Sequence, residues 1–389
     1  MHVDFTAEQQ QLRQTIRDYF TGLMTPETRE RLRGEIGGPV YKEVIRKIGA
    51  DGWLGVGWPK EWGGQGFTGI EQLIFVDEAR RAGAPLPFVT LNTVGPAIMR
   101  HGSEDQKRRF LPAILAGEVH FAIGYSEPEA GTDLASLKTR AERVGDEYVV
   151  NGTKMFTSGA NDADFVWLAT RTDASAPKHK GISILIADTR DPGFRVTPIF
   201  TVGDGRTNMT FYEDVRVPVA MRVGAENDGW KLITTQLNYE RIGLGAWGCV
   251  AQRLIDDVVD WARATRGDRG GTLAEEGWVQ VALAEAYARA EAAKVMNWRM
   301  AWELEGGKLD PARASSVKVH GTEELIEIYR LLLDVLGPAG LVKDGSPGAV
   351  VRGEIEHQMR ACQINTFGGG VNEIQRQIVA MMGLGLPRA

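Results

Sequence analysis

Residues 124–133 read Gly-Tyr-Ser-Glu-Pro-Glu-Ala-Gly-Thr-Asp and begin inside the apolar run 121–125, which predicts a short strand. Small residues and hydroxyl side chains leave the backbone N–H groups of such a loop open to a ligand. A loop of this kind after a strand suits an anion or the polar edge of a cofactor ring. The alternative from composition alone is a polar surface turn, because one short motif is only a hypothesis.

The sequence before this loop and well after it has the spacing of amphipathic helices. In residues 1–120, Thr6 and Gln9 are placed for a capping box and Ser103 for a helix N-cap. Helical periodicity returns after Gly229. Further helices are expected to start near Glu275, Ala312 and Asn372.

The segment between these helical parts is rich in β-branched and aromatic residues divided by Gly, Pro and Asp. Within it, Asn151-Gly152 predicts a hairpin turn after a run that starts at Glu147. Other expected strands are 165–170, 182–187, 194–199 and 209–217. We therefore expect an α+β chain with an N-terminal helical domain (1–120), a middle β domain (121–227) and a C-terminal helical domain (228–389).

The composition excludes several classes of function. Of the 389 residues 43% are hydrophobic and 25% are charged, as in ordinary globular proteins, and the net charge of −6 offers no basic surface for nucleic acid. The two cysteines, Cys249 and Cys362, lie far apart, which indicates neither a metal site nor a disulfide framework and fits a reducing cytoplasm. We expect no signal peptide, because the N-terminal residues lack a basic region followed by an apolar one, and no membrane span, because no apolar run approaches roughly 18 residues.

Further motifs follow residues 124–133 in a fixed order. They are Asn151–Ala160, Asp214–Pro218, Gly224–Trp230, Tyr239–Arg241 and Glu373–Arg376. In this order and spacing they closely resemble the acyl-CoA dehydrogenase family, over nearly the whole chain. Tyr125 departs from the family, which usually has an aliphatic residue there. The resemblance implies a helical domain, a β-barrel or sandwich domain, and a four-helix bundle.

The resemblance also implies that the chain binds FAD. Phe156 would stack on the flavin, where the family often has Trp, and Ser158 would bond the pyrimidine side; a core aromatic is the alternative for Phe156. No Gly-x-Gly-x-x-Gly follows a strand, so a Rossmann site is not indicated. The flavin residues implied by the resemblance are Ile123, Tyr125, Ser126, Gly131, Thr132, Phe156, Thr157 and Ser158. Those implied for the substrate are Thr132, Asn238, Arg241 and Gly370.

Dehydrogenation of an acyl-CoA at Cα and Cβ needs a carboxylate base in an apolar slot, where desolvation raises its pKa toward working pH. Most family members carry this Glu just before Glu-Ile-Gln-Arg, but here Gly369 stands at that position. The resemblance implies that Glu240 replaces it, because isovaleryl-CoA-type and long-chain members place their base at this helix position. Glu240 also lies on the helical face that carries Ile233, Leu237, Leu244 and Trp247. The alternative is a structural Glu paired with a neighbour such as Arg241.

Gly369 keeps a role under the resemblance. In the family, the backbone N–H at this position donates to the thioester carbonyl together with a ribityl hydroxyl of the flavin, forming an oxyanion hole. This donor belongs to the backbone and survives the loss of the Glu side chain. The expected catalytic residues are therefore Glu240 and Gly369.

A second departure concerns the neighbouring flavin site. Family members reach the AMP half of a neighbour's FAD with an Arg-x-x-Phe segment and a later Gln; here Arg266 is followed by Arg269 in place of Phe, and Asp334 stands at the Gln position. A carboxylate facing a pyrophosphate is repulsive. The whole chain is similar to the base-bearing subunit of heteromeric acyl-CoA dehydrogenases of bacterial steroid side-chain degradation.

This similarity implies an α2β2 hetero-tetramer with a related chain, otherwise a homotetramer. It also implies a bulky steroid side-chain acyl-CoA as substrate and an electron-transfer flavoprotein as acceptor. Two alternatives stay open: a non-catalytic subunit that completes a partner's site, and an acyl-CoA oxidase or flavin monooxygenase on the same fold.

Overall fold

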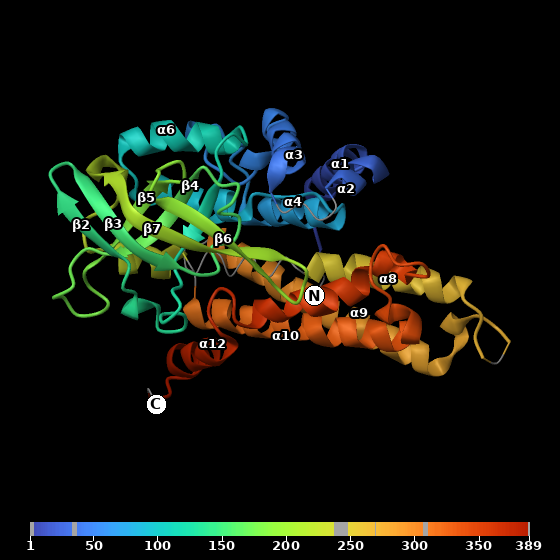
Figure 1. Ribbon diagram of the computed structural model, residues 1–389. Helices are drawn as coiled ribbons and strands as arrows, with labels where there is room; N and C mark the ends of the chain where they lie inside the picture. The colour runs from blue at the N-terminus through green and yellow to red at the C-terminus, as the bar shows by residue number, and fades with distance from the viewer. Residues whose placement is uncertain (1–3, 33–36, 237–247, 269, 306–309, 388–389) are drawn as a thin grey trace.

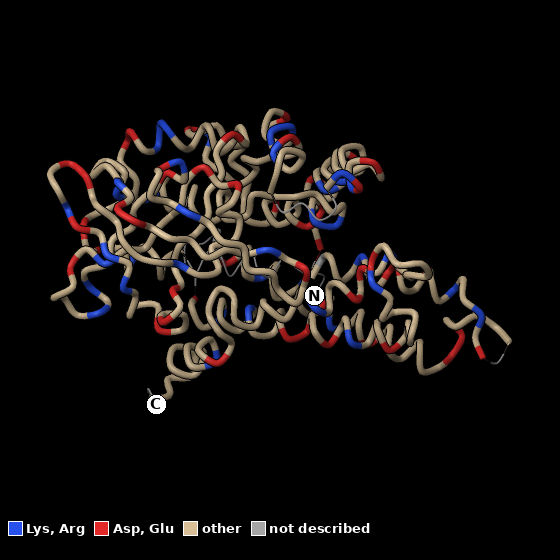
Figure 2. Tube along the Cα trace, viewed as in Figure 1, with Lys and Arg blue, Asp and Glu red and all other residues tan. Residues whose placement is uncertain are grey.

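The computed structural model describes residues 4–32, 37–236, 248–268, 270–305 and 310–387 (Figure 1). An N-terminal group of helices and a central sheet lie side by side, and long C-terminal helices run past both. Lys and Arg are interspersed with Asp and Glu along the whole trace (Figure 2). Among the described residues, no helix is both long and apolar enough to cross a bilayer.

The N-terminal part is helical, as predicted. Its helices are α1 (Ala7–Leu23), α2 (Pro26–Arg31), α3 (Gly38–Ala50), α4 (Gly69–Arg81), a π-helical turn (Val89–Val94), α5 (Gly95–His101) and α6 (Glu104–Leu115). The capping box at Thr6 and Gln9 and the N-cap at Ser103 are both confirmed by their side-chain hydrogen bonds. These caps satisfy backbone N–H groups that the first helical turn leaves without partners.

The middle part is one eight-stranded sheet. Its strands are β1 (Phe121–Gly124), β2 (Arg140–Val144), β3 (Glu147–Lys154), β4 (Phe165–Arg171), β5 (Ile182–Asp188), β6 (Phe194–Phe200), β7 (Arg206–Pro218) and β8 (Arg222–Val223). They pair in the order β6-β7-β3-β2-β4-β5-β8, and β1 pairs parallel to β4. This sheet flanked by helical parts confirms the predicted layout of helical, β and helical segments.

The predicted hairpin turn at Asn151-Gly152 is wrong. The turn lies between β2 and β3, at Gly145, whose φ is +63°. Residues 151 and 152 lie inside β3, where the register against β7 shifts between Val150 and Gly152. A Cβ at residue 152 would lie 2.5 Å from the Thr139 hydroxyl oxygen, so glycine is needed for close strand approach and not for a turn.

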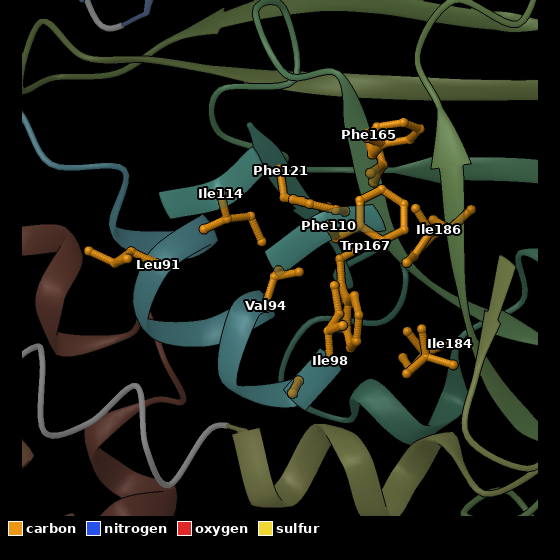
Figure 3. Packing of buried hydrophobic residues seen from close by; sticks show 14 of the residues in the cluster. Leu91, Val94, Ile98, Phe110, Ile114, Phe121, Phe165, Trp167, Ile184 and Ile186 are labelled. Carbon is orange, nitrogen blue, oxygen red and sulfur yellow. The ribbon is translucent and has the colours of Figure 1, made fainter. Parts of the chain in front are cut away.

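One hydrophobic core joins the N-terminal helices to the sheet. Figure 3 shows side chains from the π-helical turn, α5 and α6 packed against Phe121, Phe165 and Trp167 of the sheet. Phe110, Phe121 and Phe165 contact one another at centroid distances of 5.3–5.6 Å. Such aromatic pairs add to the free energy gained by burial, so the sheet has a rigid support.

The C-terminal part forms a second core of long helices. Residues 229–236 are helical and contribute the buried Ile233 to the first core. The later helices are α8 (Gly248–Ala264), α9 (Gly277–Glu305), α10 (Pro311–Leu336), α11 (Glu354–Ala361) and α12 (Asn372–Ile378). The predicted starts of α9, α10 and α12 agree within about two residues, whereas α11 was not predicted.

Candidate functional site

The two glycine-containing loops that follow β1 and β3 are hydrogen-bonded to each other. The Met155 N–H donates to the Ser126 carbonyl at 2.8 Å. The Lys154 ammonium donates to the Tyr125 carbonyl at 3.0 Å. Two motifs whose bonded residues lie 29 positions apart in the sequence therefore form one surface.

A buried ion pair supports this surface from below. The fully buried Lys154 Nζ lies 2.8 Å from Oε1 of Glu127, and Glu127 also accepts the backbone N–H groups of Lys138 and Thr139 at 2.7 and 2.8 Å. Burial lowers the pKa of Lys154 to about 8, against the opposing attraction of Glu127. Burial acts to raise the pKa of Glu127, but Lys154 and the hydrogen bonds outweigh it and hold that pKa below its ordinary value. Both groups are therefore charged at neutral pH.

The outer side of this surface is open. Phe156 has a positive φ of +61° and its side chain is 55% exposed, which excludes the alternative of a core aromatic. Gly131, Thr132 and Ser158 are exposed as well, and Ile123 is partly buried. The backbone N–H groups of Gly131 and Thr132 donate to no other described residue. Open amides beside an outward-facing aromatic ring and an exposed hydroxyl fit a flavin.

Thr157 and Ser158 differ in orientation. Thr157 is buried: its hydroxyl lies 3.2 Å from that of Thr210, its N–H donates to the Asn208 carbonyl, and its carbonyl accepts from the Asn208 amide. These bonds hold the loop and leave the exposed Ser158, whose hydroxyl lies 2.8 Å from that of Thr207, at the surface.

The Tyr125 side chain points away from the open surface. It is buried, with its hydroxyl 2.6 Å from Oε1 of Gln236 and 3.0 Å from the Trp167 indole nitrogen. Gln236 ends the described part of the helix that begins at residue 229. The site residues Asn238, Glu240 and Arg241, and the apolar partners Leu237, Leu244 and Trp247, lie outside the described residues.

A third loop, 366–372, carries the glycine at the family's usual base position. Gly369 and Gly370 have φ values of +68° and +97°, the left-handed region that favours glycine. A Cβ at Gly370 would also lie 2.6 Å from Nε2 of Gln375. The Gly369 N–H donates to no other described residue, so this backbone donor is available to a ligand.

Lys318 of α10 fixes this loop. Its buried ammonium donates to the carbonyls of Thr366 and Gly370 at 3.0 and 2.8 Å, and to the side-chain oxygen of Asn372 at 2.6 Å. Because these three acceptors surround Gly369 in sequence, one side chain sets the orientation of the Gly369 N–H.

Asn372 and Arg376 connect this loop to Glu323. The Asn372 amide donates to Thr322 and Glu323 at 3.1 and 3.0 Å, and Arg376 pairs with Glu323 at 2.7 Å. The Arg376 side chain is half-exposed, so it stands at the edge of the site and not inside it.

Two of the three residues expected at a neighbour's site, Arg266 and Asp334, lie on the surface. Asp334 is exposed near the end of α10 and pairs with Arg330 at 3.1 Å. Arg266 is exposed beyond α8, and Arg269 lies outside the described residues. Arg330 offsets part of the charge that Asp334 would present to a pyrophosphate.

Three supporting residues have no role in the prediction from sequence. Lys154 and Glu127 stand inside quoted motifs, but nothing local shows that a strand lysine and a loop carboxylate meet. Lys154 lies on the same face of β3 as the buried Tyr148 and Val150. A lysine on a buried strand face needs a partner, and this was the available signal in the sequence. Lys318 likewise interrupts the buried face of α10.

The sequence matches three family models. They are the acyl-CoA dehydrogenase N-terminal domain over residues 6–118, the middle domain over 122–215 and the C-terminal domain over 227–384. Acyl-CoA dehydrogenase FadE26 of Mycobacterium tuberculosis is 53% identical, and the match covers 100% of both chains.

Two solved structures are similar over their whole length. A chain of the ChsE4–ChsE5 complex from Mycobacterium tuberculosis has a TM-score of 0.95 and 53% identity, with 100% of both chains covered. A chain of the Tcur3481–Tcur3483 steroid ACAD also has a TM-score of 0.95, with 52% identity and 100% of both chains covered. The chain described here belongs to the acyl-CoA dehydrogenase family of oxidoreductases.

Proposed function

We propose that this chain is an FAD-dependent dehydrogenase that converts a bulky acyl-CoA, such as a steroid side-chain thioester, into its trans-2-enoyl-CoA. The observation that carries the proposal is the surface formed by the loops after β1 and β3. It presents open backbone amides and the exposed Phe156 above the buried Lys154–Glu127 pair. Such a surface matches what a flavin needs: hydrogen-bond donors at its polar edge and an aromatic face.

In this proposal FAD would be held by the outward-facing residues of these loops, with Phe156 against the ring and Ser158 at its polar edge. Thr157 is buried, so it would not touch FAD but would hold the loop that carries Phe156 and Ser158. When bound, FAD supplies the acceptor for the hydride that leaves the β-carbon. The division of the chain into the domains 1–120, 121–227 and 228–389 stays a prediction.

The proton chemistry belongs to the chain itself. Glu240 would accept the α-proton, and the electron pair of that C–H bond would form the double bond as hydride leaves Cβ. The Gly369 N–H would donate to the thioester carbonyl, where negative charge develops, and such a preoriented donor is worth roughly 10²–10³ in rate. Thr132, Asn238, Arg241 and Gly370 would contact the thioester or the CoA.

The choice of substrate and assembly rests on the neighbours and on the surface. The Tcur3481–Tcur3483 structure is a steroid ACAD, and both similar structures are complexes of two different chains. In this chain, α9 exposes Trp278, Val281, Val295 and Trp302 along its length. An exposed apolar stripe of this kind marks a protein interface, which supports an α2β2 assembly with a related chain.

The activity test uses the chain co-expressed with a related acyl-CoA dehydrogenase chain as its partner. A steroid side-chain acyl-CoA should reduce the bound flavin anaerobically and give the trans-2-enoyl product. Flavin reduction without an enoyl product, or no reduction, would contradict the proposal. Mixing the reduced complex with air or with an electron-transfer flavoprotein then distinguishes a dehydrogenase, which should react fast only with the flavoprotein, from an oxidase.

The assembly test counts flavin. Expressed alone, the chain should be flavin-poor, whereas the complex should hold about one FAD per heterodimer. Trp302→Lys on α9 should weaken the complex, and Val144→Lys, an exposed substitution on β2, serves as its matched control. A yellow homotetramer with four bound FAD would contradict the heteromeric assembly and leave the dehydrogenase reaction intact.

A further inference from the structure

The tyrosine at which this chain departs from its family is buried between two groups that fix the direction of its hydrogen bonds. The Trp167 indole nitrogen can only donate, so the Tyr125 hydroxyl accepts from it at 3.0 Å. The Tyr125 hydroxyl in turn donates to Oε1 of Gln236 at 2.6 Å. The resulting chain of donors runs from β4, through the loop after β1, to the helix that begins at residue 229.

This chain of bonds is buried throughout. Trp167 has no exposed surface, and Tyr125 and Gln236 are only 7% and 4% exposed. Hydrogen bonds shielded from water contribute more than exposed ones, and leaving one buried partner unsatisfied is costly. An aliphatic side chain at position 125 would leave both the indole N–H and the Gln236 carbonyl oxygen without this partner.

The orientation of the Gln236 amide follows from its bond to Tyr125. With Oε1 turned to the hydroxyl, Nε2 borders a cavity of about 20 Å³ between α5 and residues 232–236. Thr93 and His101 line the same cavity. Nε2 of Gln236, Oγ1 of Thr93 and Nε2 of His101 are all buried without a hydrogen-bond partner in the described part of the chain.

We propose that Tyr125 is a positioning residue, which anchors the start of the segment that carries Glu240 to the sheet beneath the flavin loop. Gln236 precedes Glu240 by four residues. The backbone carbonyl of Tyr125 accepts a hydrogen bond from the Lys154 ammonium. Tyr125 therefore contacts both Lys154, which supports the two loops, and Gln236, which ends the described part of the helix that begins at residue 229. The inference rests on the proposed function for its kinetic consequence, but the anchoring itself does not.

The first experiment is Tyr125→Phe in the flavin-loaded complex. We expect an unchanged flavin content, an unchanged KM for the acyl-CoA and a kcat lower by about tenfold, the rate equivalent of one buried hydrogen bond. Tyr19→Phe is the matched control, because it also removes a hydroxyl that donates to a side chain, here Asp51 at 2.7 Å, far along the sequence from the site. A full kcat in Tyr125→Phe would overturn the proposal.

The second experiment tests whether Tyr125 acts through Gln236. Gln236→Met keeps the tyrosine hydroxyl but removes its acceptor. It should cost as much kcat as Tyr125→Phe, and the double variant should lose no more than either single variant. Additive losses would show that the two residues act separately, and the proposal would fail. If Tyr125→Phe proves unstable, a full kcat in Gln236→Met alone would overturn it.

The third experiment needs neither flavin nor substrate. Hydrogen–deuterium exchange of the peptide that covers residues 229–236 should rise in Tyr125→Phe and stay at the wild-type level in Tyr19→Phe. A rise without any dehydrogenase activity in the wild-type complex would reject the proposed function and keep the anchoring. No rise would reject the anchoring, whatever the activity.

Discussion

Two glycine-containing loops of this molecule are each held by a buried lysine, but the two lysines hold them differently. In the loop after β1, Lys154 and Glu127 are both part of the motifs that form the surface, and they make a buried ion pair. In the loop 366–372, Lys318 comes from α10, and its ammonium donates to two carbonyls and an amide oxygen. The first arrangement supports a whole surface from below, whereas the second orients one short stretch of backbone.

The difference suggests different roles in the proposed reaction. A surface that holds a large cofactor needs a stable platform, and an ion pair formed by its own two loops ties them together. A single backbone donor needs angular precision, since a misplaced donor stabilises the developing negative charge less well. We therefore expect damage to the first support to release FAD, and damage to the second to slow turnover while FAD stays bound.

The largest effect is expected for Lys154→Met. It leaves the Glu127 carboxylate buried without its partner, which should destabilise the chain by about 3–5 kcal/mol and empty the flavin site. Thermal unfolding and the flavin absorbance of the complex measure both. The double variant Lys154→Met with Glu127→Leu should recover much of the stability, and a double variant as unstable as Lys154→Met would argue against the pair.

A smaller effect on stability but a large one on rate is expected for Lys318→Met. The loop 366–372 loses three hydrogen bonds, so kcat should fall by roughly a hundredfold, as when an oxyanion donor is lost. The flavin content should stay near one per heterodimer. Loss of FAD together with activity would show that the two loops are not separable in this way.

The flavin surface itself predicts a moderate effect. Ser158→Ala should weaken FAD binding by about 1–3 kcal/mol, the value of one or two hydrogen bonds. Thr207→Val, which removes only the protein partner of that hydroxyl, should weaken it less. Arg376→Gln is the control that should leave the visible spectrum alone, and an equal loss in all three variants would remove Ser158 from the flavin site.

The smallest effect concerns acid pH. The pKa of Glu127 in the folded chain lies below its ordinary value of 4.5, so its contribution to stability is present above pH 4.5 and is lost as pH falls through the lower, folded value. The slope is at most about 1.4 kcal/mol per pH unit for one proton. The free energy of unfolding of wild type and of Glu127→Gln should therefore converge as pH falls from above 4.5 to below the folded pKa of Glu127. Parallel curves would contradict it.

The fold was largely predictable because its signals are local. Helical periodicity predicted α9, α10 and α12 near their observed starts, and β-rich runs predicted every strand except β2 and β8. The turn predicted at Asn151-Gly152 is wrong because this dipeptide occurs both in turns and at irregular positions inside strands. The close approach of Thr139 to Gly152, which requires glycine here, is not visible in the sequence. The helix α11 was not predicted, because it is only eight residues long and a helix this short depends on tertiary packing for its stability.

The sequence motifs pointed to candidate residues that would contact a ligand directly. They did not point to the residues that hold those candidates in place. The motifs pointed to Phe156 and Ser158, which are exposed, and to Gly369, which has the left-handed conformation. The contacts of Lys154, Lys318 and Tyr125 join residues from 27 to 111 positions apart, and no spacing rule covers such distances. Glu240 lies outside the described residues, so its role stays a prediction.

The most direct test isolates proton abstraction from hydride transfer. A steroid side-chain acyl-CoA in which sulfur replaces the β-carbon has no hydride to lose, so only its α-proton can react. In D2O, the flavin-loaded wild-type complex should exchange that α-proton for deuterium, as mass spectrometry would show. Glu240→Gln with the same flavin content should exchange it at least about a hundredfold more slowly, the lower end for a general base. Equal exchange rates in the two complexes would contradict Glu240 as the base and the mechanism built on it.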